Sequence, residues 1–121
     1  MSEPIFNYDE ISDTLYVSFA PGEVATGIEL NEHILLRINK QERRAIGLTF
    51  FEYSLLAQRT EMGPRSFPLT GLAALSDELR DLVLEILLQS PVNELLLLSA
   101  YTPSIVETIP ITSLQPVPVA G

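Results

Sequence analysis

Three carboxylates lie close together near the start of the chain and are its best candidates for chemistry. They are Asp9, Glu10 and Asp13, within an acidic stretch. Carboxylate oxygens are the ligands that Ca²⁺ and Mg²⁺ prefer, so one hypothesis is a small metal-binding protein or enzyme that uses this turn. The spacing does not match an EF-hand loop. We favour the alternative, a hairpin turn in which Asp9 and Asp13 accept backbone N–H bonds, with no metal site.

Other residue types that support catalysis are scarce. His33 is the single histidine, and we predict a surface position beside a turn, because no orienting acid and nucleophile accompany it. The chain has no cysteine, which excludes disulfides and thiolate metal sites. Glycine-rich phosphate-binding loops and the motifs of common hydrolases and metalloproteases are also missing from the sequence. We therefore assign no catalytic residue and no cofactor, and favour a protein without enzymatic activity.

The composition is typical of one folded, acidic domain. With 46% hydrophobic and 19% charged residues, the chain does not resemble a disordered protein. Its 7 basic and 16 acidic residues give a net charge of −9, which argues against nucleic acid and anionic membranes as partners. Neither a signal peptide nor an unbroken apolar stretch of about 20 residues is visible. We expect a soluble, cytoplasmic protein.

Apolar and polar residues alternate with a period of two over residues 5–53, as expected for half-buried antiparallel strands. Short breaks such as Pro21-Gly22 separate these stretches. They suit hairpins and are too short to hold a crossover helix. We therefore predict a five-stranded antiparallel meander. Leu15 and Val17 are predicted to face the core from its second strand.

One main helix is predicted within a helical segment at residues 70–90. Ser76 is a good N-cap, and Pro91 marks the end. An apolar stripe at helical spacing is wide enough that the helix must pack on another element, and the sheet is the obvious partner. The stripe consists of Leu79, Leu82, Val83, Ile86 and Leu87.

We predict two strands within residues 94–112, with Pro110 at an edge or a bulge. A helix at residues 94–101 stays open as an alternative, because leucine is a better helix former than strand former. Residues 113–121 are uncharged and are expected to form an extended tail. The predicted fold class is α+β: an antiparallel β-meander packed on one main helix, with a C-terminal β extension, in a single domain at residues 1–112.

The chain offers more apolar side chains than one core of this size needs. The resulting candidates for an interface are Leu35, Phe51, Leu84 and Leu88. Tyr16 and Tyr53 are expected to share the second face of the sheet with the first two of these residues. Either residues 92–112 or another subunit could cover that face, and the sequence leaves both open. We predict a homo-oligomer, with a dimer as the simplest form.

Two opposite charges are expected to meet on that face. Glu29 and Arg37 lie on adjacent predicted strands and point outward by the same alternation. A cross-strand ion pair of this kind contributes about 0.2–1 kcal/mol. No further observation from the sequence gives this pair a role in function.

The first half of the chain contains Tyr8-Asp9, then Asp13-Thr14-Leu15-Tyr16-Val17, and later Gly27-Ile28-Glu29-Leu30. Over about residues 6–54 this pattern resembles a family of small bacterial proteins, the domain of unknown function 2283. The usual Asp-Gly hairpin tip of that family is replaced here by the sequence from Asn39 to Arg43. The resemblance implies a small antiparallel sheet with a helix, and it implies no established activity and no catalytic residue.

Some members of that family resemble the antitoxin half of small two-gene modules, so the resemblance also implies a protein partner. Together with the missing catalytic motifs, it favours a non-catalytic, antitoxin-like interaction module or a self-associating one. The alternative is the carboxylate-based metal-binding protein or enzyme that would use the acidic turn.

Overall fold

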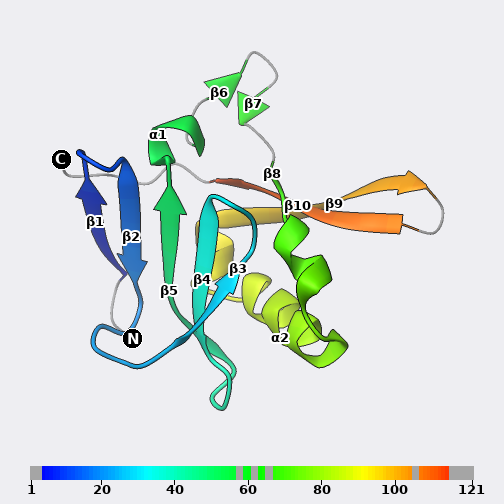
Figure 1. The fold of residues 1–121 in the computed structure, drawn as a ribbon, viewed down its shortest axis with the longest axis horizontal. Helices are drawn as coiled ribbons and strands as arrows, with labels where there is room; N and C mark the ends of the chain where they lie inside the picture. Colours follow the sequence, from blue (N-terminus) through cyan, green and yellow to red (C-terminus); the bar gives the residue numbers. More distant parts are fainter. Residues whose placement is uncertain (1–3, 57–58, 61–62, 65–66, 105–106, 115–121) are drawn as a thin grey trace.

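A five-stranded antiparallel sheet is the largest element of the computed structural model, which describes residues 4–56, 59–60, 63–64, 67–104 and 107–114 (Figure 1). Its strands are β1 (Ile5–Asp9), β2 (Thr14–Ser18), β3 (Thr26–Glu29), β4 (Ile34–Asn39) and β5 (Arg44–Phe51). The five predicted strands are thereby confirmed. Leu15 and Val17 face the core, as predicted, with exposed fractions of 1% and 0%.

The order of the strands differs from the predicted meander. The sheet runs β1-β2-β5-β4-β3, so β5 lies between β2 and β4. The sequential pairs β1–β2, β3–β4 and β4–β5 form as predicted, and the prediction is wrong for β2 and β3. Residues 19–25 cross three strand spacings, about 14 Å, which a connection of this length spans easily. This arrangement of β2 to β5 is a Greek key. Alternation along the sequence shows which side chains of a strand share a face of the sheet, but it does not specify which strands are neighbours.

The second half begins with short elements. They are α1 (Tyr53–Leu56), β6 (Arg59–Thr60), β7 (Gly63–Pro64), β8 (Phe67–Pro68) and the 3₁₀ helix η1 (Thr70–Ala74). The Gly71 N–H donates to the carbonyl of Leu30 at 2.8 Å, so η1 lies against the end of β3. A Cβ at Gly71 would collide with the carbonyl of Glu29, so only glycine fits this close approach.

The main helix, α2 (Asp77–Leu87), packs on one face of the sheet. Ser76 caps it, because the Ser76 hydroxyl accepts the N–H of Leu79 at 3.3 Å. The predicted apolar stripe is buried in the same cluster as the strands, except that Leu79 is only half-buried. The buried members of the stripe are Leu82, Val83, Ile86 and Leu87. We call the covered side of the sheet the inner face and the opposite side the outer face.

The C-terminal part forms a second sheet. After the 3₁₀ helix η2 (Val92–Glu94), β9 (Leu96–Ser104) and β10 (Glu107–Leu114) pair with β8 in the order β8-β10-β9. The strand prediction is therefore confirmed over the helical alternative from Leu96 onward. Pro110 follows a register shift in β10, in agreement with the expected bulge. The rest of the predicted tail, residues 115–121, lies outside the described residues.

Val92, Leu95 and Leu96 join the inner-face core together with α2. In Figure 1 the yellow segment that carries η2 lies behind β4, and β2, β5 and β4 are drawn without a helix in front of them.

Within the described part of the chain, none of the helices has the length and apolar character needed to cross a membrane.

Leu15→Ala should destabilise the protein by about 2–5 kcal/mol, because it leaves a cavity in the core beneath α2. Urea unfolding followed by circular dichroism measures this difference. Val24→Ala is the control, since Val24 is 92% exposed and its truncation should change the free energy of unfolding by less than about 0.5 kcal/mol. Equal midpoints for Leu15→Ala and the wild type would show that the faces are misassigned.

Candidate functional site

The acidic turn between β1 and β2 uses its carboxylates as hydrogen-bond acceptors. Oδ1 of Asp9 accepts the N–H of Ile11 at 3.0 Å, which closes a local turn. The Asp13 carboxylate accepts the N–H of Ser54 at 3.1 Å through Oδ1, and also accepts the Ser54 hydroxyl. Tyr8 donates its hydroxyl to Oδ1 of Asp13 at 2.6 Å. Asp13 therefore joins the turn to the start of α1.

The role of Asp13 differs in one respect from the sequence-based expectation. Asp13 was expected to accept a backbone N–H as part of a hairpin turn, and it does accept one. The N–H belongs to Ser54, however, which is far along the chain and adjacent to the turn only in the folded protein. The carbonyl of Asp13 also accepts the N–H of Tyr53 at 2.9 Å. Asp13 adopts a positive φ of 52°, which Asp tolerates better than most residues. No pattern in the sequence signals this long-range cap.

The same contacts shift two pKa values. Hydrogen bonds from the Ser54 hydroxyl and from Tyr8 lower the pKa of Asp13. The hydrogen bond to Asp13 is the largest of the effects that raise the pKa of Tyr8 to about 12. Glu10 is exposed, and in the described part of the chain no three His, Cys, Asp or Glu side chains are grouped to hold a metal ion. The arrangement is that of a structural clamp between the turn and α1.

Asp13→Asn should destabilise the protein at neutral pH, because an amide accepts hydrogen bonds from Ser54 and Tyr8 less strongly than a carboxylate does. The folded state lowers the pKa of Asp13 from 3.8, so this stabilisation is present above that value and is lost as the pH falls through the folded-state pKa. The stability difference between wild type and variant in urea should therefore close in acid. Glu10→Gln is the matched control. The stability difference between Glu10→Gln and the wild type should not change with pH. A constant difference down to strong acid would contradict this role of Asp13.

Tyr8 should ionise near pH 12, last or among the last of the 4 tyrosines, and Tyr8→Phe should remove this late step from the alkaline absorbance titration. Its folded-state pKa is raised from 10.0, so the stability that it supplies is present below pH 10 and is lost as the pH approaches about 12. Tyr16→Phe is the control and should retain the late step. A titration in which Tyr8→Phe removes only an early step would contradict the hydrogen bond to Asp13.

The outer face of the sheet carries three rows of side chains, defined by the strand register. The middle row runs Tyr16, Thr49, Leu35 and Glu29 across β2, β5, β4 and β3. One flanking row contains Ser18, Gly47, Arg37 and Gly27, and the other contains Thr14 and Phe51. Tyr16 and Phe51 are 44% and 41% exposed, whereas Thr49 between the strands is buried. Apolar and aromatic groups therefore surround a small buried centre.

The expected ion pair between Glu29 and Arg37 does not form within the chain. The register places Leu35 opposite Glu29 and Gly27 opposite Arg37, so the two charges are offset by one row. The Arg37 guanidinium instead lies over Gly47 of β5, where an added Cβ would collide with it. The ion pairs of the described residues include neither Arg37 nor Glu29.

The structure separates the four candidate interface residues into two pairs. Leu35 and Phe51 lie on the outer face, Leu35 half-buried. Leu84 and Leu88 belong to α2 and its C-cap on the other side of the sheet, where Leu84 packs against the core and Leu88 is 62% exposed. Tyr53 was expected on the outer face, but it packs against the core, with its ring 5.9 Å from that of Tyr8.

His33 lies beside the turn before β4, as predicted, but its side chain is only 19% exposed. Its Nδ1 lies 3.5 Å from Oε1 of Glu52. Glu52 is distant from His33 in the sequence, so the sequence alone did not indicate this contact. Glu52 follows β5, and the pairing of β5 with β4 brings the two together. Nδ1 is buried without a hydrogen-bond partner within the described part of the chain. A lone imidazole beside one carboxylate does not constitute a catalytic centre.

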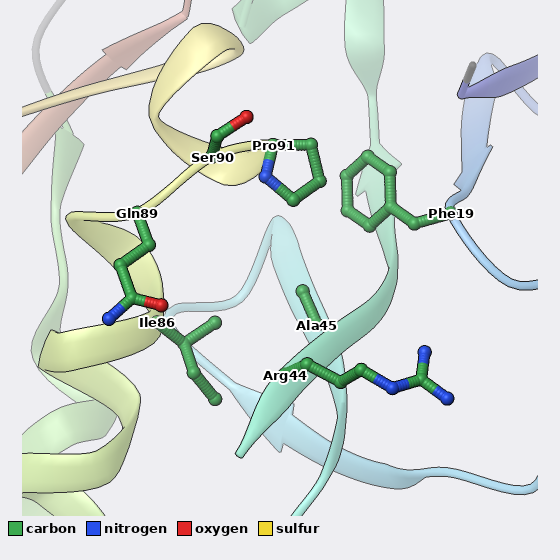
Figure 2. A pocket seen from close by; sticks show the side chains of 7 residues that line it. All are labelled: Phe19, Arg44, Ala45, Ile86, Gln89, Ser90 and Pro91. Atoms are coloured by element: carbon green, nitrogen blue, oxygen red, sulfur yellow. The ribbon is translucent and has the colours of Figure 1, made fainter. Parts of the chain in front are cut away.

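A pocket of about 340 Å³ lies between the end of α2 and the start of β5 (Figure 2). It is lined by Phe19, Arg44, Ala45, Ile86, Gln89, Ser90 and Pro91. Arg44 pairs with Glu42 at 2.5 Å and with Glu23. Figure 2 shows its guanidinium directed away from Gln89 and Ser90. Its charge is therefore already compensated, and the walls of the pocket are mainly apolar.

The described residues define a small α+β protein in which a Greek-key sheet is covered by one helix on one face. Residues 5–54 match the family model described as "Protein of unknown function (DUF2283)", which confirms the resemblance seen in the opening motif. The match includes all five strands of the larger sheet. No curated protein and no solved structure matches the chain.

Proposed function

We propose that this chain is a non-catalytic, self-associating module, and that the outer face of its five-stranded sheet is where two copies pair. The observation that carries the proposal is the group formed by Tyr16, Phe51 and Leu35 on a regular sheet surface. The first two are more than 40% exposed, and apolar groups gathered on one exposed face favour an interaction surface. The described helices support this choice, since α2 and η2 contribute to the core on the inner face.

A second copy is a suitable partner for this surface because a two-fold interface places the same patch on both sides. Five strands about 4.8 Å apart and three rows about 6.8 Å apart define a face of about 24 by 20 Å. That is about 480 Å² for each copy, below the roughly 800 Å² per partner of a standard stable interface. We therefore expect a weak dimer. The net charge of −9 opposes association, and salt screens it beyond about 10 Å.

Sedimentation equilibrium at tens to hundreds of micromolar tests the proposal. The wild type should show a monomer–dimer equilibrium, and Tyr16→Lys and Phe51→Lys should shift it to monomer, because a charge in the middle of the interface is desolvated without a partner. Leu88→Lys is the matched control. Leu88 is 62% exposed on the other side of the sheet, so its substitution should leave the equilibrium unchanged. Circular dichroism verifies that each variant is folded.

Two results would contradict the proposal. A monomeric wild type throughout this concentration range would mean that the outer face is not a self-association surface. A dimer that resists Tyr16→Lys and Phe51→Lys but is lost in Leu88→Lys would place the interface on α2.

A further inference from the structure

We infer that two reciprocal ion pairs, each between Arg37 of one copy and Glu29 of the other, set the orientation of the dimer. This inference rests on the proposed self-association and names the contacts that make the surface complementary to itself. It starts from the two charges that fail to pair within one chain.

Among the described residues, Arg37 has no carboxylate as an ion-pair partner. It is half-buried, and its guanidinium lies over Gly47. Its Nε atom is buried without a hydrogen-bond partner in the described part of the chain. The residue as a whole is only partly buried and keeps its full charge, so a carboxylate supplied by a partner would form a charge-assisted contact with this side chain. The absence of a side chain at Gly47 leaves room for the cation in the plane of the interface.

Glu29 is the matching anion. It is exposed on β3, on the same outer face as Arg37, and takes part in none of the ion pairs of the described residues. Its backbone is held by the pairing of β3 with β4 and by the approach of η1 at Gly71. Its carboxylate is thus presented from a fixed position next to the apolar group.

The strand register separates the two charged residues by the same displacement as the two exposed aromatic residues. Glu29 lies one strand and one row away from Arg37, and Phe51 lies one strand and one row away from Tyr16 in the same direction. On an ideal sheet, one line across the face therefore lies midway between both pairs. With strands about 4.8 Å apart and rows about 6.8 Å apart, this line passes within about 2 Å of Thr49.

A two-fold axis along that line makes all of these contacts at once. It places Arg37 over Glu29 of the partner subunit and Tyr16 over Phe51 of the partner subunit, each twice. Leu35 then lies beside Leu35 of the partner subunit, near the axis. An axis that instead superimposed Arg37 on its own copy, or Glu29 on its own copy, would oppose like charges, so charge selects one orientation.

Charge reversal tests the inference in the full chain. Arg37→Glu and Glu29→Arg should each weaken homodimerisation about ten-fold or more, because like charges then face each other at both symmetric positions. An equimolar mixture of the two variants should recover association, since both opposite-charge contacts return in the mixed dimer. The double variant, with both reversals in one chain, should dimerise as the wild type does. Sedimentation equilibrium measures all four samples.

Asp81→Arg is the control, because it makes the same charge change as Glu29→Arg at an exposed position on α2. It should not weaken association. If Arg37→Glu fails to fold, Glu29→Arg alone decides, since Glu29 is exposed and its reversal does not disturb Gly47. Circular dichroism verifies folding.

The results separate the inference from the proposed function. A wild type that dimerises, loses the dimer in Tyr16→Lys and is unaffected by both charge reversals would overturn the inference and leave the outer-face dimer intact. A mixture that fails to recover association although both variants are folded would also overturn it. A monomeric wild type would remove the proposed function itself.

Discussion

Burial of one apolar layer between the sheet and α2 is the constraint on which the rest of the structure depends. The strands contribute residues such as Leu15, Leu48 and Phe50, and the helix contributes Val83 and Ile86, all at most 3% exposed. This contact buries the apolar stripe of α2 away from water, and α2 is too short to be stable alone in water. η2 adds Val92 to the same layer. The layer uses most of the inner face, and so it determines which face of the sheet is left for other contacts.

The position of β5 depends on that layer as well. As the central strand, β5 places Leu48 and Phe50 in the middle of the core. The connection from β2 to β3 crosses the sheet, so β5 can lie between β2 and β4. The end of β5 then meets the turn between β1 and β2, where Asp13 binds Ser54 and Tyr53. The acidic residue that attracted a chemical interpretation therefore serves to attach the end of the sheet to α1.

The outer face follows from the same arrangement, because the described helices that join the core lie on the other side. Its centre is closed by Thr49 and by Arg37 lying over Gly47, and its rim exposes aromatic rings. On this face, the step across the strand register from Arg37 to Glu29 is the same as the step from Tyr16 to Phe51. The proposed two-fold pairing would use both of these features of the outer face.

The sequence by itself determined the strands, the helix with its Ser76 cap and the inward direction of Leu15 and Val17, because local periodicity and capping depend on residues close in the chain. It also carried the family resemblance. Only the tertiary structure decided that β5 lies beside β2, that Asp13 caps α1, that Tyr53 faces the core, and that Glu29 and Arg37 do not pair. Each of these depends on strand order or register between distant segments, which the alternation of side chains leaves undetermined.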